Sequence, residues 1–211
     1  MVTVPLFSTS MPEVVLASSS PRRAELLERA GIPFEVMPSH TDEVWDASLP
    51  AERAVCAIAR AKAADVRRRM ASDDARAVVA CDTAVLANGV VFGKPHDRAA
   101  ASHMLHALSG RTHQVMSGVC VLPPGFRLED AETGERKCPP VLFADVTDVT
   151  FFPLSDADID GYLDCGEYRD KAGSYGIQGR GSLLVARISG NYDNVVGLPL
   201  ARLVRALAEV V

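Results

Sequence analysis

The sequence predicts an α/β fold, and two observations carry that prediction. Short apolar runs, typical of buried strands, alternate along the 211 residues with segments whose apolar residues recur at helical spacing. Turn residues such as Gly31, Pro33 and the pair Asn88-Gly89 separate these runs. The sequence contains no internal repeat and no low-complexity tract, which excludes repeat architectures.

The first elements follow from apolar patterning and from one proline. Val14–Ala17 is a short, wholly apolar run that indicates a buried strand. Pro21 suits the first turn of a helix, where its missing N–H group would have no partner anyway. The predicted elements of this half are strands over Val14–Ala17, Phe34–Met37 and Ala77–Cys81, the last ending at Asp82-Thr83, and helices over Pro21–Ala30 and from Pro50 onward, the latter containing Lys62.

The second half carries the strongest turn signal and a helix cap. Asn88-Gly89 between two apolar segments predicts a hairpin, because both residues accept positive φ. Asp97 is placed to cap a helix that runs to Leu108. We expect Pro123–Pro140, rich in proline, glycine and charge, to form a mobile loop without chemistry. The remaining predicted elements are strands over Thr112–Val121, Val141–Phe151 and Leu183–Ile188, and helices over Ser155–Leu163 and Pro199–Val210.

Composition and charge exclude several classes of protein. No apolar run approaches the ~20 residues that span a bilayer, and the first ten residues do not have the pattern of a secretory signal, so we expect a cytoplasmic protein without membrane contact. A net charge of −5 argues against a nucleic-acid partner. The five cysteines are scattered and form no CxxC pair, which favours free thiols over disulfides or a zinc knuckle.

The stretch Leu16–Arg23, LASSSPRR, has the composition of a phosphate-binding turn. It joins the first predicted strand to the first predicted helix, where backbone N–H groups and the helix dipole favour an anion. An N-cap serine before an ordinary solvated helix is the alternative reading of a Ser-Pro-Arg step. Hydroxyl and guanidinium groups supply further donors, from Ser18, Ser19, Ser20, Arg22 and Arg23.

Further polar groups fall where predicted elements end. They are Asp42-Glu43, Asp82 with Thr83, Lys94, and the run Lys171–Gly181, whose four glycines permit close backbone approach to a ligand. Carboxylates at strand ends suit Mg²⁺ or a similar hard cation that bridges phosphate oxygens, and basic side chains neutralise charge on a leaving phosphate. Together these groups predict an acid, metal and phosphate site.

Other common site patterns do not fit the chain. The Walker pattern fails because Gly93-Lys94 is followed by Pro95, and the HExxH and GxSxG patterns are absent. His103 and His106 share a helix face, but no third ligand is near them in sequence, so zinc is disfavoured.

An ordered set of motifs covers nearly the whole chain, from about Val14 to Val204. In chain order they are LASSSPRRAELL, the Asp42-Glu43 pair, Lys62 in its helix, ACDTAV around Asp82, GKP at Lys94, LSGRTHQV, DKAGSYGIQG and NVVGLPL. This set resembles the Maf family of nucleoside triphosphate pyrophosphatases. The resemblance implies an N-terminal extension over residues 1–12 and a single domain over residues 13–211, with an inosine-triphosphatase-like mixed sheet in two lobes, flanking helices and a deep central cleft.

The resemblance also implies a reaction and the residues that perform it. With a divalent cation, Mg²⁺, Mn²⁺ or Co²⁺, the family cuts a nucleoside triphosphate between its α and β phosphates to give monophosphate and pyrophosphate. Water attack on the α-phosphorus then depends on positioning and electrostatics rather than on a covalent intermediate. By family matching, Asp82 is the proton acceptor and, with Glu43, a metal ligand. The triphosphate is held by Ser18 and by three residues that act with Asp82 in catalysis, Arg23, Lys62 and Lys94.

Base choice divides the family, and this chain resembles the branch that prefers dTTP and UTP. That branch carries arginine, threonine and glutamine where this chain has Arg22, Thr83 and Gln178, and Lys171 agrees with it as well. A glutamine offers a donor and an acceptor to the imide edge of a pyrimidine, whereas a glutamate would suit guanine. The choice among dTTP, UTP and modified pyrimidine triphosphates, and the formation of a homodimer, stay open.

Some features depart from the family pattern, and two other functions compete with hydrolysis. Cys81, Tyr168-Arg169 and the length of the Pro123–Pro140 loop are unusual, but none of them is a predicted catalytic residue. A non-catalytic, nucleotide-sensing inhibitor of septum formation is disfavoured because Asp82 and Glu43 are both present. A single-strand nucleic-acid binder is disfavoured by the acidic charge and by an aromatic content of only 6%.

Overall fold

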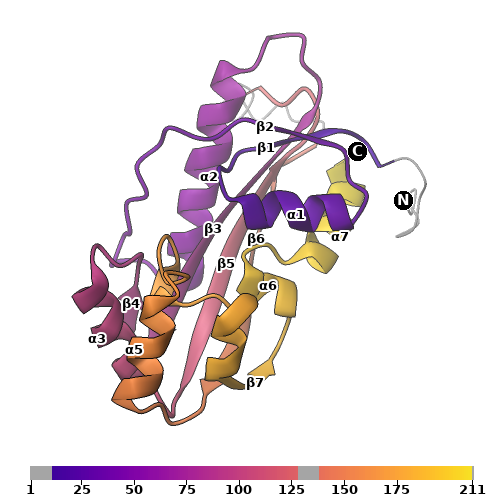
Figure 1. Cartoon of the computed structure of the whole chain (residues 1–211). Helices are drawn as coiled ribbons and strands as arrows, with labels where there is room; N and C mark the ends of the chain where they lie inside the picture. The colour runs from indigo at the N-terminus through magenta and orange to yellow at the C-terminus, as the bar shows by residue number, and fades with distance from the viewer. Residues whose placement is uncertain (1–10, 128–137, 211) are drawn as a thin grey trace. The chain divides into compact units, whose positions relative to one another are not determined.

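Figure 1 shows the chain in a computed structural model, which describes residues 11–127 and 138–210. The strands are β1 (Val14–Leu16), β2 (Phe34–Val36), β3 (Ala77–Ala87), β4 (Val90–Phe92), β5 (Thr112–Leu122), β6 (Val141–Phe151) and β7 (Val185–Ser189). The helices are α1 (Pro21–Arg29), α2 (Ala51–Arg69), α3 (Arg98–Leu108), α5 (Asp156–Asp164), α6 (Tyr192–Val196) and α7 (Leu200–Val210), with the 3₁₀ turns η1 (Ala172–Ser174) and η2 (Gly179–Leu184).

The strands pair into a mixed sheet, which confirms the predicted α/β class. Their order is β2-β1-β3-β5-β6-β7, and β4 pairs with β3. Strand β1 is parallel to both β2 and β3, whereas the β3–β4 and β6–β7 pairs are antiparallel. A parallel pair needs a crossover connection, and α1 and α2 supply the two crossovers around β1.

The chain packs as two compact units whose boundaries fall inside strands β3, β5 and β6. Unit 1 comprises Met1–Asp82, Gly118–Ala144 and Gly197–Val211. Unit 2 comprises Thr83–Ser117 and Asp145–Val196. The single domain over residues 13–211 stays a prediction.

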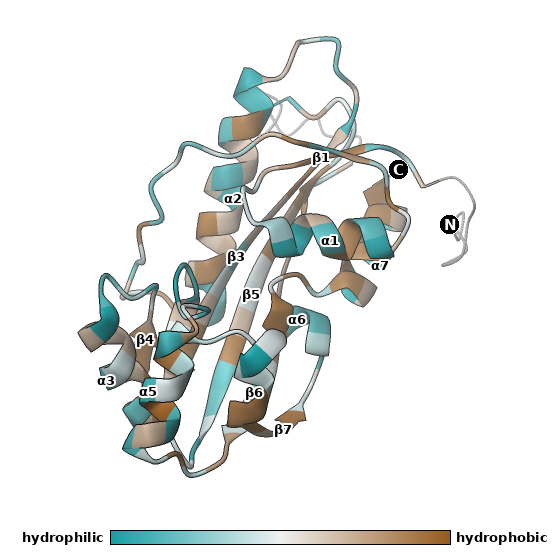
Figure 2. Cartoon of the chain, in the orientation of Figure 1, coloured by the Kyte–Doolittle hydropathy of each residue, from teal (hydrophilic) through white to brown (hydrophobic). Residues whose placement is uncertain are grey.

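Unit 1 is built around the apolar face of α2. Figure 2 shows hydrophobic and hydrophilic bands alternating along this helix, as expected for a helix with one face in a core. That face packs on side chains of β1, β3 and β5 in a cluster that includes Ala59, Ala63, Val66, Val15, Val78, Ala80 and Cys120. The packing fixes α2 against the strands and brings the buried residue Lys62 with it.

Unit 2 is held by aromatic packing and by helices whose starts are capped. The Asp97 carboxylate accepts a hydrogen bond of 2.7 Å from the Ala100 N–H, which confirms the predicted cap of α3. At the start of α5, Ser155 and Asp158 form a reciprocal capping box. The two helices contribute to a core that includes Leu105, Leu108, Val149, Phe151, Ile159, Tyr162 and Tyr175.

Local signals predicted some boundaries correctly and others wrongly. The hairpin is confirmed, because Asn88 and Gly89 have φ of 51° and 76° and pair Val85 with Phe92. The predicted strand end at Asp82-Thr83 is wrong. Strand β3 continues to Ala87, since the residues after Thr83 are still apolar and mostly buried and the chain does not turn before Asn88.

In the second half of the chain, the structure differs from the sequence prediction at one strand and at one helix. The strand predicted over Leu183–Ile188 begins later, at Val185, because Leu183 is 76% exposed within η2. Helix α6 was not predicted from the pattern of the sequence. Of the predicted Pro123–Pro140 loop, residues 128–137 lie outside the described residues.

All five cysteines are free thiols, as predicted. Among the described residues, no helix has the length and apolar character needed to cross a bilayer.

A buried aromatic cluster in unit 2 contains His113, which is only 2% exposed. Its Nε2 lies 2.8 Å from the Tyr175 hydroxyl, and its ring meets Phe151 and Tyr175 edge to face, with centroids 4.9 and 5.3 Å away. Burial lowers the pKa of His113 from its ordinary value of 6.5 to about 4, because the charged imidazolium would lose its hydration. The folded protein therefore keeps His113 neutral at pH 5 to 7.

We expect His113 to make stability depend on pH. Below about pH 6.5 the unfolded chain binds a proton at His113 that the folded chain does not bind until about pH 4, so acid favours unfolding. The free energy of unfolding should fall by about 2 kcal/mol between pH 7 and pH 5 from this group alone. Urea unfolding at both pH values measures the change, with His113→Gln as the variant and His103→Gln as the control. An equal pH dependence in wild type and His113→Gln would contradict the assignment.

Candidate active site

The turn after β1 lies beside the middle of β3. Leu16 pairs with Val79, and the Ala17 N–H donates to the Val79 carbonyl at 2.8 Å, after which the chain leaves the sheet. The serine-rich turn therefore follows the carboxyl end of β1, next to the part of β3 that contains Cys81 and Asp82. Ligands of α/β proteins are commonly bound at such strand ends.

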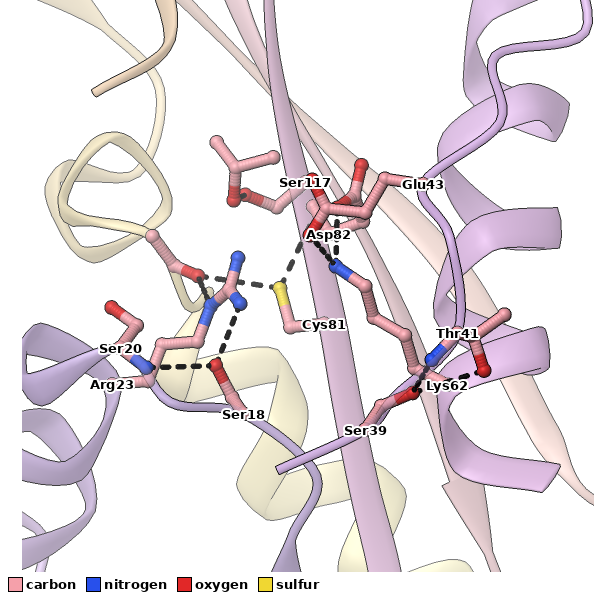
Figure 3. A network of polar contacts seen from close by, with 12 residues as sticks. Ser18, Ser20, Arg23, Ser39, Thr41, Glu43, Lys62, Cys81, Asp82 and Ser117 are labelled. Carbon is pink, nitrogen blue, oxygen red and sulfur yellow. Dashed lines mark hydrogen bonds and ion pairs between the residues drawn. The ribbon is translucent and has the colours of Figure 1, made fainter. Parts of the chain in front are cut away.

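Within this turn, the Ser18 hydroxyl and the Arg23 guanidinium hold one another (Figure 3). Arg23 donates from Nη1 to Ser18 Oγ at 2.9 Å, and the Ser20 N–H donates to the same oxygen at 3.2 Å. Ser20 occupies the N-cap position of α1, yet its side chain makes no capping hydrogen bond. The Ser18 hydroxyl therefore accepts from both Arg23 and the Ser20 backbone, and Ser20 does not act as an ordinary helix cap.

A backbone carbonyl orients Arg23 from a distant part of the chain. The Gly197 oxygen accepts a 2.9 Å bond from Arg23 Nε and also a bond from the Cys81 thiol, with 3.2 Å between sulfur and oxygen. Gly197 has φ of +131°, a conformation that other residues rarely adopt. Sequence reasoning included this glycine in NVVGLPL but gave it no role, because a carbonyl contact leaves no trace in residue type.

A buried ammonium group bridges two carboxylates on the other side of β3. Lys62 Nζ lies 2.6 Å from Glu43 Oε1 and 2.7 Å from Asp82 Oδ1. The Lys62 and Asp82 side chains are only 8% and 11% exposed, whereas the Glu43 side chain is 46% exposed. The Lys62–Asp82 contact is thus a nearly buried ion pair, and Glu43 is the more exposed partner of Lys62.

Strand geometry separates the two groups of contacts. Successive side chains of a strand point to opposite faces, so Cys81 points toward Arg23 and Asp82 toward Lys62. Figure 3 shows Arg23 and Lys62 on either side of the strand. The predicted strand end at Asp82 is not needed for its carboxylate to meet Lys62, because the side chain reaches that face from within β3.

The carboxylates fit a divalent metal ion only as part of a larger coordination shell. Glu43 and Asp82 each present an oxygen to the same cation, the Lys62 ammonium, and hard oxygen ligands are those that Mg²⁺ and Mn²⁺ prefer. Among the described residues, no group of three or more His, Cys, Asp and Glu side chains is arranged to hold a metal. A cation at Glu43 and Asp82 would therefore take its other ligands from water and phosphate oxygens.

Of the other predicted site residues, Arg22 belongs to unit 1, and Thr83, Lys94, Lys171 and Gln178 belong to unit 2. Thr83 Oγ1 lies 2.9 Å from Ser117 Oγ. Lys94 is exposed just after β4, and the Gly93 carbonyl next to it accepts a 3.1 Å bond from the Gly173 N–H, which ties the GKP turn to the glycine-rich run.

Within that run, the side chains of Lys171 and Gln178 behave differently. The Lys171 ammonium donates to the Glu167 carbonyl, whereas Gln178 is exposed.

The structure thus brings together Ser18 with Arg23, and Glu43 with Lys62 and Asp82, in unit 1. In unit 2 it joins the Lys94 turn to the run that holds Lys171 and Gln178. Arg22 is partly buried on α1.

Comparison with known proteins finds close relatives over most of the chain. Residues 13–210 match the family model described as Maf-like protein. The dTTP/UTP pyrophosphatase of Bacillus velezensis is 44% identical over 93% of this chain and 95% of its own length. The enzyme of the same name from Halalkalibacterium halodurans is 43% identical over 93% of this chain and 95% of its own length.

Among solved structures, a nucleoside-triphosphatase / dITP/XTP pyrophosphatase from Mycobacterium abscessus matches with a TM-score of 0.39 and 14% identity. The match covers 66% of this chain and 74% of that chain. The family model and the two enzymes at more than 40% identity therefore carry the assignment.

We expect the Lys62 bridge to appear in a double-mutant cycle. Lys62→Met should lower the free energy of unfolding by roughly 3 kcal/mol, because it leaves the buried Asp82 carboxylate without its partner. Adding Asp82→Asn should restore part of that loss, so that the two changes are clearly non-additive. Glu43→Gln should change stability by about 1 kcal/mol or less, since its carboxylate is half exposed. Urea unfolding of wild type, Lys62→Met, Asp82→Asn and the double variant gives the coupling. Additive effects of Lys62→Met and Asp82→Asn would contradict the bridge.

Proposed function

The chain belongs to the Maf family, and on that basis we propose that it is a nucleoside triphosphate pyrophosphatase that hydrolyses dTTP and UTP to the monophosphate and pyrophosphate. Identity of 44% to a dTTP/UTP pyrophosphatase over nearly the full length of both chains is the observation that carries the activity. The arrangement of Glu43, Lys62 and Asp82 supplies the chemistry that such a reaction needs.

Asp82 is the group that accepts the proton of the attacking water. Its carboxylate is nearly buried and is oriented by the bond from Lys62 Nζ to Oδ1, so little reorganisation is needed during the reaction. Lys62 balances the negative charge of Asp82 and Glu43 and lies next to any phosphate oxygen that approaches them.

Glu43 and Asp82 are the residues that would hold a divalent cation. When bound, such a cation screens the charge of the phosphate oxygens and polarises the α-phosphorus toward water. Since Lys62 already contacts both carboxylates, its ammonium must shift or share these oxygens when metal binds. Mg²⁺, Mn²⁺ and Co²⁺ all remain candidates for the cation.

The triphosphate is bound by fixed cationic and hydroxyl groups. In unit 1, Arg23 donates to Ser18 and to the Gly197 carbonyl, so its guanidinium keeps a defined direction. Lys94 of unit 2 adds a charge on an exposed turn. This reaction needs positioning and charge stabilisation rather than a covalent intermediate, which suits residues of these kinds.

The base is read by Arg22, Thr83 and Gln178, with Lys171 supporting the glycine-rich run. The Gln178 amide can donate to and accept from the imide edge of thymine or uracil. The Lys171 ammonium is bonded to the Glu167 carbonyl and therefore acts through the loop as well as through its charge. A cytoplasmic location stays our prediction for the protein, and the formation of a homodimer stays open.

Pyrophosphate release tests this proposal directly. Purified protein with Mg²⁺, Mn²⁺ or Co²⁺ should convert dTTP and UTP to monophosphate and pyrophosphate, with slower turnover of ATP and GTP. Asp82→Asn should lower turnover by ~10² or more, the usual scale for loss of a general base. Chromatography of the nucleotide products separates this reaction from stepwise removal of orthophosphate. Orthophosphate as the only product would contradict cleavage between the α and β phosphates, and inactivity with every metal would leave the non-catalytic nucleotide-sensing alternative.

Gln178→Glu should change base choice while it spares the chemistry at phosphorus. A carboxylate cannot donate to a pyrimidine carbonyl, so we expect kcat/KM for dTTP and UTP to fall by about tenfold or more. The metal dependence and the inhibition by inorganic tripolyphosphate should stay as in wild type, because they report on the phosphate end. An unchanged ratio of dTTP to GTP turnover would show that Gln178 does not read the base.

A further inference from the structure

The segment that carries Gln178 is anchored on its N-terminal side by buried aromatic side chains of unit 2. Tyr175, three residues before Gln178, is 5% exposed and its hydroxyl lies 2.8 Å from His113 Nε2. The next residue, Gly176, donates its N–H to the Tyr162 hydroxyl at 3.2 Å. Burial and these bonds fix the backbone just before the glutamine.

On the C-terminal side, one carboxylate holds the backbone. Glu167 accepts hydrogen bonds from the Arg180 N–H, at 3.2 Å to Oε1 and 3.1 Å to Oε2, and from the Gly181 N–H at 3.3 Å to Oε2. These amides belong to the first turn of η2, whose N–H groups lack partners within the turn. A carboxylate that accepts from backbone N–H groups makes stronger bonds than a neutral acceptor would.

Close packing leaves this loop little freedom. A side chain at Gly179 would bring its Cβ within 2.8 Å of Glu167 Oε1, and one at Gly181 would meet the Gly176 carbonyl oxygen. The Lys171 side chain packs against Gly176, and a Cβ added at Gly176 would lie 2.7 Å from Lys171 Cε. Gly181 is therefore required by the backbone that faces it and Gly179 by its φ of +61°, whereas the contact at Gly176 is with a flexible lysine side chain.

We propose that Glu167 is a positioning residue for base recognition, which rests on the proposed role of Gln178 as the reader of the base. Gln178 is exposed and lies two residues before Arg180, so its direction follows from the backbone that Glu167 holds. Glu167 itself acts through Arg180 and Gly181 and touches no reacting atom. A shift of about 1 Å in a recognition group can change rates by up to ~10²-fold.

The test compares Glu167→Ala and Glu167→Gln with Glu28→Gln, which removes the same charge from an exposed position on α1. For each protein, kcat and KM are measured with dTTP and GTP, together with inhibition by inorganic tripolyphosphate. In Glu167→Ala the dTTP-to-GTP ratio of kcat/KM should fall about tenfold, mainly through a higher KM for dTTP. Glu167→Gln keeps a carbonyl oxygen as acceptor and should retain most of the ratio. Tripolyphosphate inhibition should be unchanged throughout, and Glu28→Gln should match wild type.

An unchanged ratio in a folded Glu167→Ala protein overturns the inference, and so does a matching loss of tripolyphosphate inhibition, which indicates general loss of structure. If Glu167→Ala does not fold, Glu167→Asp replaces it. The aspartate side chain is one methylene shorter, so keeping its bonds to the Arg180 and Gly181 N–H groups must displace the start of η2 and lower the dTTP-to-GTP ratio of kcat/KM. A wild-type ratio in Glu167→Asp overturns the inference in that case. Failure of the proposed function is distinct, since wild-type protein would then release no pyrophosphate from dTTP, and the base-reading role would fall with it.

Discussion

The buried ammonium of Lys62 between Glu43 and Asp82 is the interaction on which the rest of unit 1 depends. Removing these charges from water is unfavourable, and it is tolerated only when each charge meets its partner at close range. Three separate parts of the chain must therefore be in register: α2, the loop after β2, and the middle of β3. The apolar packing of Ala59, Ala63 and Val66 on the strands supplies that register. Apolar side chains in place of both Lys62 and Asp82 would avoid this desolvation altogether, so the buried pair is better explained by chemistry than by stability.

The carbonyl of Gly197 extends the same constraint to the turn that contains Ser18 and Arg23. One oxygen accepts from Arg23 Nε and from the Cys81 thiol, and Cys81 is the neighbour of Asp82 on β3. This shared oxygen orients Arg23 relative to β3, the strand that contains Asp82, although 174 residues separate Arg23 from Gly197. Cys81 departs from the family pattern, yet it contributes a donor that alanine or glycine would not have. Its effect is to add a second bond to the oxygen that holds the arginine.

The sequence was sufficient where local chemistry decides the structure, and insufficient where tertiary packing or backbone atoms decide it. Asp97 and Ser155 cap their helices, and Asn88-Gly89 turns the hairpin, because each uses its own side chain or φ preference nearby. The polar pair Asp82-Thr83 resembled a strand end, but burial of the following residues carries β3 onward. The roles of Glu167 and the Gly197 carbonyl rest on bonds to or from main-chain atoms, which no residue pattern reveals.

The proposed phosphate-binding residues and the proposed base-reading residue are held in place by different kinds of contact. In the proposed function, the groups that act on phosphate are fixed by charge pairing, as Lys62 is by Asp82, or by bonds to strands and turns. The group proposed to read the base, Gln178, extends from a loop whose backbone is fixed by Glu167 and by Tyr175. The hydrogen bonds given above for Lys62 and Arg23 involve neither Gln178 nor Glu167. Changes are nearly additive when sites share no partners. A single phosphate chemistry can therefore serve different bases when only the loop is altered.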